Sequence, residues 1–398
     1  MKRVIFVLPG MRGGGAERVA SLLANRLHDR GVDVSCLLTH ARNDEVKKCD
    51  LDEEIPLILI KEKNSKHFLR TFVAKLARVY SSAICKLFEK AGRQAPVHFA
   101  YVSFWSEYHN EIRELRNILQ SKPDLAIIAF LQPAIPITLL AAQGLPNKVI
   151  ISERADPERI LKKRYGVKFI KKYYPRADAA VFQTENAMAA YPEEVSSKGT
   201  VIPNPLKPGL PEPYHGERSR TITTFCRLSH VKDLPTMLAA FKLLHDSHPD
   251  YTLRIIGDAS DEAGKRIRAE LDEYILQNSL SGSVSFEPFD PDIHKKIMRD
   301  AMYVNSSYTE GLCNAMLEAL AIGMPSVCTD CPIGGARATI TDGENGLLVP
   351  IRDPEALCLA MERVIEEPGL ADKLSLNAAK LRDELDIDSI TDRWMKLL

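Results

Sequence analysis

The chain has 398 residues, enough for two domains of ordinary size. Its composition, with 45% hydrophobic and 27% charged residues, is typical of a soluble globular protein and excludes a low-complexity chain. The net charge is zero at pH 7, but residues 1–205 carry 32 Lys and Arg against 22 Asp and Glu, and the remainder carries 21 against 31. This asymmetry predicts that the first half faces an anionic surface or ligand.

The first elements along the chain predict a parallel α/β sheet. Residues 4–8 form a continuous apolar run, typical of a strand buried on both faces, and no secretory signal is visible there. A Gly-rich loop and a helix over 16–30 follow. Further strands are predicted at 32–39, 125–130, 148–152 and 179–182. The uncharged stretch 125–142 is interrupted by Gln132, Pro133 and Pro136, so a strand, a proline loop and a helix fit it better than a membrane span.

The Gly-rich loop fails the two common nucleotide fingerprints. Gly10 and Gly15 have the spacing of a phosphate-binding P-loop, but Ala16 and Glu17 stand where Lys and Ser or Thr are needed. Arg18 occupies the third glycine position of a dinucleotide loop, so the loop predicts neither an ATP nor an NAD site. Its glycines either bring bare amides and a helix start close to a ligand in a cleft, or only form a tight turn.

A linker over 202–219, with five prolines, separates two α/β patterns. Strands are predicted beyond it at 221–226, 252–256, 283–286, 302–305, 325–328 and 347–349. We therefore expect two doubly wound, Rossmann-like domains that face each other across a cleft. Their predicted bounds are 1–205 and 206–380, with residues 381–398 forming a helix that crosses back to the first domain.

Two glutamates mark the strongest candidate site. Glu310 and Glu318 are separated by seven residues, so a helix that begins near Gly311 places them about two turns apart. Glu318 lies among Ala, Leu and Met, and a buried carboxylate needs hydrogen-bond donors, which ribose hydroxyls would supply. The amides of Gly311, Leu312 and Cys313 would suit an anion or sugar oxygens. Paired glutamates on a helix are also common as purely structural features.

The chain resembles glycosyltransferase family 4 over most of its length. The match is carried, in order, by "GGGAERVASLLANRL", "ISERADP", "VIPNPL", "FCRLSHVKDLPTMLAAFKLL", "LRIIGD" and the EX7E-like "EGLCNAMLEALAIGMPSVCTD". The resemblance implies the GT-B fold and retaining, metal-independent sugar transfer from a nucleotide diphosphate sugar. The "SER" and "EGLCNA" segments are similar to those of bacterial transferases that build surface polysaccharides and lipid-linked oligosaccharides.

The same resemblance implies roles for individual residues. Arg227 and Lys232 would clamp the donor diphosphate, and Glu318 would hold the ribose. Glu310, with the amides of 311–313, would hold the hydroxyls of the donor sugar, so the expected catalytic residues are Glu310, Arg227 and Lys232. The remaining expected substrate contacts are Glu318, Gly311, Leu312, Cys313, and Gly14 and Gly15, which would close over the diphosphate and the acceptor.

No metal or other cofactor is predicted. Cys328 and Cys331 have metal-like spacing, but no second pair completes a zinc site, and neither Asp-x-Asp sequence ends a convincing strand. The chain also departs from the family. Phe130 and Gln132 stand where many relatives place a His, so no general base is assigned in the first domain. Cys226 also replaces the usual Gly before Arg227. Ala259 and Phe289 stand where the family has glycines, and these two departures bear on the specificity for the nucleotide base.

Two stretches, 61–93 and 154–176, are strongly basic. Each has nine Lys and Arg against two acidic residues. The first predicts an amphipathic helix whose apolar side includes Leu76, Tyr80 and Leu87. It is either a core-packed helix with a solvated face or a surface that docks on an anionic membrane. Nucleic acid is not an expected partner, because no binding motif appears.

These patterns together predict a cytoplasmic enzyme, peripheral at the inner face of the membrane. It would transfer a hexose or N-acetylhexosamine from a nucleotide diphosphate sugar, with UDP favoured, to a hydroxyl of a lipid-linked or polysaccharide glycan. Two alternatives stay open at this point: a sugar-nucleotide epimerase of the same architecture, and an inactive scaffold of a polysaccharide assembly complex.

Overall fold

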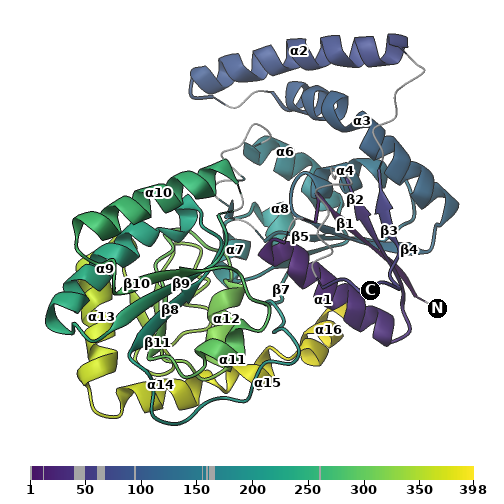
Figure 1. Ribbon diagram of the computed structural model, residues 1–398. Helices are drawn as coiled ribbons and strands as arrows, with labels where there is room; N and C mark the ends of the chain where they lie inside the picture. The colour runs from purple at the N-terminus through teal and green to yellow at the C-terminus, as the bar shows by residue number, and fades with distance from the viewer. Residues whose placement is uncertain are drawn as a thin grey trace. The chain divides into compact units, whose positions relative to one another are not determined.

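The computed structural model describes residues 2–11, 13–39, 50–60, 68–93, 96–154, 156–157, 160, 166–259 and 261–398. The chain divides into two compact units. The first consists of Met1–Pro205 and Ile387–Leu398, and the second of Leu206–Asp386. Each unit has its own parallel sheet and hydrophobic core, as the sequence predicts (Figure 1).

The first unit is built on a seven-stranded parallel sheet in the order β3-β2-β1-β4-β5-β6-β7. Its central strands are buried almost completely, because helices cover both faces of a parallel sheet. The two edge strands, β3 and β7, were not predicted, and each has only three residues. The strands are β1 (Arg3–Leu8), β2 (Asp33–Leu38), β3 (Leu57–Leu59), β4 (Leu125–Phe130), β5 (Val149–Ser152), β6 (Ala179–Phe182) and β7 (Gly199–Val201).

The helices of this unit follow the strands in the usual βα alternation. The stretch considered as a membrane span forms β4, a proline turn and the short buried helix α4. None of the described helices has the length and apolar character needed to cross a membrane. The helices are α1 (Gly15–Asp29), α2 (Phe68–Lys90), α3 (Val97–Ser121), α4 (Ala134–Ala141), α6 (Gly166–Tyr173), α7 (Glu185–Ala189), α8 (Glu193–Ser196) and α16 (Ile387–Met395), with a 3-10 turn, η2, at Tyr174–Arg176.

The second unit has a six-stranded parallel sheet in the order β10-β9-β8-β11-β12-β13. Its strands are β8 (Thr221–Phe225), β9 (Thr252–Ile256), β10 (Val284–Glu287), β11 (Met302–Asn305), β12 (Ser326–Thr329) and β13 (Leu347–Val349). Its helices are η3 (His230–Lys232), α9 (Leu234–Ser247), α10 (Glu262–Gln277), α11 (Ile293–Ile297), α12 (Asn314–Ala321), α13 (Pro354–Glu366), α14 (Leu370–Ala378) and α15 (Leu381–Glu384). The order changes direction at β8, and such a switch point is where open α/β sheets bind ligands.

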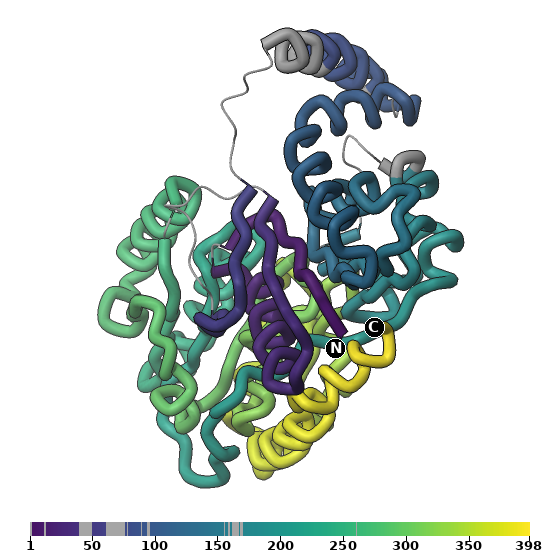
Figure 2. The backbone as a smooth tube through the Cα atoms, turned by 90° about the vertical axis from the view of Figure 1, so that its right-hand side faces the viewer, coloured from purple at the N-terminus to yellow at the C-terminus, as the bar shows by residue number. Residues whose placement is uncertain are grey.

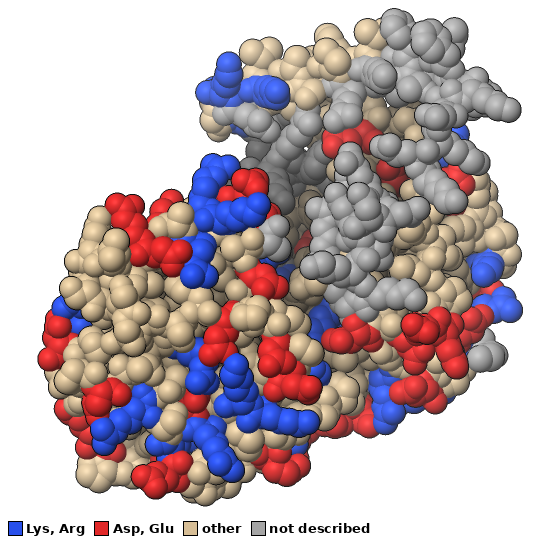
Figure 3. All heavy atoms as spheres, viewed as in Figure 1, with Lys and Arg blue, Asp and Glu red and all other residues tan. Residues whose placement is uncertain are grey.

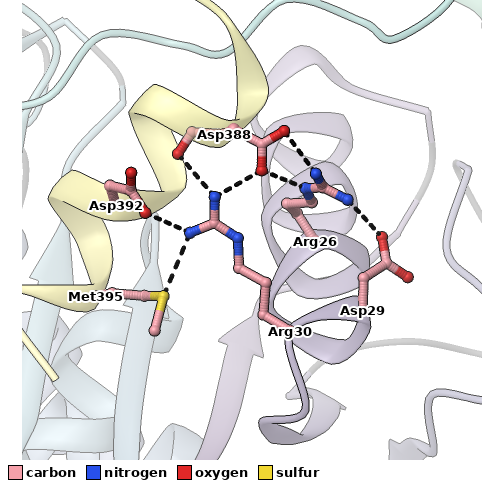
Figure 4. Close-up of polar contacts among 6 residues, drawn as sticks. All are labelled: Arg26, Asp29, Arg30, Asp388, Asp392 and Met395. Atoms are coloured by element: carbon pink, nitrogen blue, oxygen red, sulfur yellow. Dashed lines mark hydrogen bonds and ion pairs between the residues drawn. The ribbon is translucent and has the colours of Figure 1, made fainter.

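The C-terminal helix α16 belongs to the first unit, where it packs on α1 (Figure 2). Arg26 and Arg30 of α1 both donate to the Asp388 carboxylate, at 2.5–2.7 Å (Figure 4). These hydrogen bonds lower the pKa of Asp388 to about 2. Trp394 is fully buried and stacks on Phe130 at the end of β4, with ring centroids 5.8 Å apart. An ion-pair network and a buried aromatic contact therefore hold the chain's last helix.

Candidate active site

The predicted residues of the second unit gather at the carboxyl ends of β8 and β11, next to the switch point. Lys232 ends the 3-10 turn η3, which follows β8. Glu310 lies in the loop between β11 and α12. Two contacts hold η3 beside this loop: the Ser306 hydroxyl donates to the carbonyl oxygen of Lys232 at 2.8 Å, and the Tyr308 amide donates to that of Val231 at 3.1 Å. Two segments 78 residues apart thus meet at one edge of the sheet.

Lys232 and Glu310 form a partly buried ion pair. The Lys232 Nζ lies 2.8 Å from the Glu310 Oε2 and 3.9 Å from the Cys313 Sγ. Burial alone would lower the pKa of Lys232, but the neighbouring Glu310 carboxylate raises it above its ordinary value. The amine is therefore a fixed cation at neutral pH, which suits the binding of an anionic group rather than proton transfer.

Arg227 lies on the same edge of the sheet, two residues after β8. It is exposed and forms no ion pair with another described residue of the chain. Its guanidinium is always charged and offers donors in a fork that matches phosphate oxygens. The edge therefore carries one cation already paired with a carboxylate and one that is open to solvent.

Glu318 is buried inside α12 and has a protein partner that the sequence did not identify. Its Oε2 lies 2.8 Å from the Nε2 of His294 on α11, and both side chains are more than 90% buried. The His294 ring lies edge-on to Phe225 at the end of β8, with centroids 5.7 Å apart. The expectation that a buried Glu318 needs a donor is met in part by this histidine. The sequence indicated only that a buried Glu318 needs a hydrogen-bond donor. It did not point to His294, because nothing around this histidine resembles a motif.

The helix that carries Glu318 starts later than predicted. The sequence placed its beginning near Gly311, whereas α12 begins at Asn314, and Cys313 is its N-cap residue. The amides of Gly311 and Leu312 therefore belong to the loop before the helix rather than to its first turn. Burial raises the pKa of the Cys313 thiol, so it is a neutral thiol at neutral pH and not a nucleophile.

Two glycines hold the backbone of this site, and sequence reasoning missed both. A Cβ on Gly335 would lie 1.6 Å from the carbonyl oxygen of Gly311, and one on Gly257 would lie 1.9 Å from that of Cys226. Only glycine allows such close approach of two backbones. Gly335 therefore supports the loop that carries Glu310, and Gly257 supports the end of β8 before Arg227.

The remaining expected contacts, Gly14 and Gly15, lie in the first unit. Gly14 is the N-cap of α1, and its amide donates to the Glu17 carboxylate at 2.8 Å rather than being bare. A second polar cluster occupies the carboxyl edge of this unit's sheet. Gln132 donates to the Tyr174 hydroxyl at 2.9 Å, which donates to the buried Glu153 at 2.8 Å. Sequence reasoning assigned no role to this group.

Buried Arg154 adjoins that cluster. Its guanidinium donates to Ser152 and Asn204 at 2.8 and 2.6 Å and lies over the Trp394 ring. Burial lowers the pKa of Arg154 to about 9. Among the described residues, no group of three or more His, Cys, Asp or Glu side chains is arranged to hold a metal ion. Cys328 and Cys331 are both buried free thiols, and Cys49 lies outside the described residues.

Comparison with known proteins finds a family match over most of the second unit. Residues 212–381 match the family described as glycosyl transferases group 1. The match includes every site residue of the second unit named above, from Arg227 to Gly335.

Relatives and solved structures extend the likeness to the whole chain. An uncharacterized glycosyltransferase of Haemophilus influenzae is 26% identical over 181 residues, which are 45% of this chain and 49% of that protein. The chain thus matches about half the length of this relative. A Campylobacter jejuni N-acetylgalactosaminyltransferase that acts on an undecaprenol-linked glycan is 24% identical over 100% of this chain and 98% of its own.

The Anabaena protein HepE, solved with UDP and glucose, covers 100% of this chain and 99% of its own with a TM-score of 0.74 at 16% identity. This likeness confirms the predicted GT-B fold with two Rossmann-like domains.

Proposed function

We propose that the protein is a retaining glycosyltransferase that uses a nucleotide diphosphate sugar, with UDP favoured. It transfers a hexose or N-acetylhexosamine to a hydroxyl of a lipid-linked or polysaccharide glycan. The observation that carries the proposal is the Lys232–Glu310 pair at the switch point of the group 1 domain, with Arg227 exposed on the same edge. The Campylobacter relative, whose name describes such an acceptor, supports the choice of acceptor class.

In this proposal the two cations stabilise the leaving diphosphate, as a divalent metal does in other transferases. Arg227 and Lys232 bind its oxygens, so no metal is required. Glu310, fixed by Lys232, accepts hydrogen bonds from the donor sugar, and Glu318 accepts from the ribose. Gly14 and Gly15 contribute contacts to the diphosphate and the acceptor. In a front-face reaction the leaving phosphate takes the proton of the acceptor hydroxyl, so the missing histidine near Gln132 does not prevent transfer.

We propose a peripheral position at the inner face of the cytoplasmic membrane, through the basic stretches 61–93 and 154–176. Parts of both stretches, residues 61–67, 155, 158–159 and 161–165, lie outside the described residues. The support is their charge, nine basic against two acidic residues in each, because anionic lipid attracts each cation near its surface by about 1 kcal/mol.

A thermal-shift screen with UDP-, GDP- and ADP-sugars, each with and without EDTA, tests the donor assignment. A ligand that binds the native state raises the melting temperature, and at 100 times its Kd it adds about 2.7 kcal/mol. We expect one nucleotide series to raise it equally with and without EDTA. A shift abolished by EDTA would overturn metal independence.

Acceptor-dependent release of free nucleotide diphosphate distinguishes the transferase from an epimerase, and absence of both binding and release would support a scaffold.

A further inference from the structure

The long helix α2 turns an apolar face to solvent. Four large side chains, Leu76, Val79, Tyr80 and Leu87, are between 55% and 68% exposed. At about 100° per residue they lie within one arc of the helix, and the small Ala83 between them is exposed as well. Periodicity alone leaves open whether this side packs into a core, and the exposure of Leu76, Tyr80 and Leu87 shows that it does not.

The opposite face of α2 holds the helix in place with small side chains. Ser81 and Cys85 are each 1% exposed, and the Ser81 hydroxyl donates to the carbonyl oxygen of Ala77. The helix α2 packs on α3, and the two helices lie side by side in both backbone views (Figures 1 and 2). Tyr80 touches Phe99 of α3 at a centroid distance of 6.4 Å while staying largely exposed. Most of the surface of the apolar stripe is therefore left exposed when α2 packs on α3.

Basic side chains accompany the stripe. Lys86, Lys90 and Arg93 are exposed at the carboxyl end of α2, where Figure 3 shows blue side chains beside a tan surface at the upper left. At about 100° per residue, Lys90 falls inside the arc, between Val79 and Ala83, and Lys86 falls about 20° outside it on the same side. An apolar stripe bordered by long cationic side chains matches a lipid surface, because the chains keep their charged ends among headgroups while the stripe enters the acyl region.

We propose that α2 is an interfacial anchor that inserts the face formed by Leu76, Val79, Tyr80, Ala83 and Leu87 into an anionic lipid leaflet. The four large side chains together expose roughly a few hundred Å², whereas a standard protein interface buries about 800 Å² on each partner. The stripe is thus small for a stable dimer but sufficient for one helix lying in a membrane surface. The cationic border selects anionic lipid. This inference deepens the membrane part of the proposed function by adding an apolar contact to an electrostatic one.

Vesicle binding tests the anchor without any turnover. The full chain is sedimented with vesicles of phosphatidylcholine alone and of phosphatidylcholine with phosphatidylglycerol. We expect binding to the mixed vesicles, and we expect the double variant Leu76→Ser, Leu87→Ser to lose about tenfold or more of it. The matched control is Leu276→Ser, Leu359→Ser, which replaces leucines that are 73% and 61% exposed on α10 and α13 of the other unit and should bind as the natural chain does.

Salt separates the apolar contact from the electrostatic one. The double variant Lys86→Gln, Lys90→Gln should lose binding mainly at low salt, because exposed charges are screened at high salt and apolar contacts are not. Unchanged binding of Leu76→Ser, Leu87→Ser, or no binding of the natural chain to mixed vesicles, would overturn the proposal. So would a shift of this variant from dimer to monomer in size-exclusion chromatography, since a second copy would then cover the stripe. The donor-induced thermal shift of the variant is measured separately, so failure of the anchor and failure of the transferase assignment are distinguishable.

Discussion

Glu310 and Glu318 are close in sequence, yet they occupy two different environments in the second unit. Glu310 lies in a loop, keeps about a quarter of its side chain exposed and is paired with a lysine at the end of the 3-10 turn η3. Glu318 lies inside α12, is almost fully buried and is paired with a histidine from a short helix. The first carboxylate can be reached by a ligand with small rearrangement, whereas the second, the proposed ribose contact, has only 6% of its side chain exposed and is held by a histidine of the same domain. Mutations on the two sides should therefore separate turnover from stability.

Removing the lysine should give the largest loss of activity. Lys232→Met deletes a fixed cation from the proposed diphosphate site, and loss of one preorganised charge-stabilising group typically costs about 10²–10³-fold in kcat. Because Glu310 is partly exposed, water can replace the lost partner, and the fold should survive. Initial rates of nucleotide diphosphate release measure the effect. Lys242→Met, which removes a lysine paired with Asp246 within α9, is the control, and equal rates in both variants would contradict the assigned role.

Gly335→Ala should disturb the Glu310 environment through the backbone. The added methyl carbon would meet the Gly311 carbonyl oxygen at 1.6 Å, so the loop must move. Overpacking of this kind costs about 1–3 kcal/mol, and the displaced loop should lose most of the activity as well. Gly282→Ala is the matched control, since nothing lies within 4 Å of its added Cβ. Chemical denaturation and rate measurements on both variants check the prediction, and a fully active Gly335→Ala would show that the loop need not be fixed.

Replacing the partner of Glu318 should act mainly on stability. His294→Leu removes this donor from a buried carboxylate, and losing a hydrogen bond to a charged group costs about 1.5–3 kcal/mol. His294→Gln keeps a donor amide and should restore part of the loss. The matched comparison is His248→Leu, whose partner Glu366 is 63% exposed and can return to water at a cost of about 0–1 kcal/mol. If His294→Leu unfolds at the same denaturant concentration as His248→Leu, the burial of Glu318 does not make its histidine more important for stability than that of the exposed Glu366.

The sequence predicted more of the fold than of the site, for physical reasons. Apolar runs and glycine or proline breaks locate both parallel sheets, because each buried central strand is marked by an apolar run in its own sequence. His294 and Gly335 could not be found this way, since their roles arise from contacts with residues 24 positions away or more. The start of α12 was placed three residues too early, because the Gly311 amide belongs to a loop that Gly335 supports from another segment. The exposed stripe of α2 was likewise invisible, since periodicity gives the apolar face but not what covers it.

Asp388 in the first unit extends the comparison to an exposed carboxylate, whose removal should have the smallest effect on stability. Its folded pKa of about 2 is below the ordinary value of 3.8, because Arg26 and Arg30 hydrogen-bond to the charged form. The contribution to stability is therefore present above about pH 4 and is lost as the pH falls toward 2.

Asp388→Asn should lower the melting temperature at neutral pH by no more than about 2 °C, since exposed ion pairs contribute little. The difference between the variant and the natural chain should vanish toward pH 2, and added salt should reduce it at every pH. Asp246→Asn, whose Lys242 partner lies one turn away in the same helix, provides the comparison without a link to the last helix. A melting-temperature difference that persists unchanged at the acidic end would mean that Asp388 acts through shape rather than charge, and that packing of Trp394 alone holds α16.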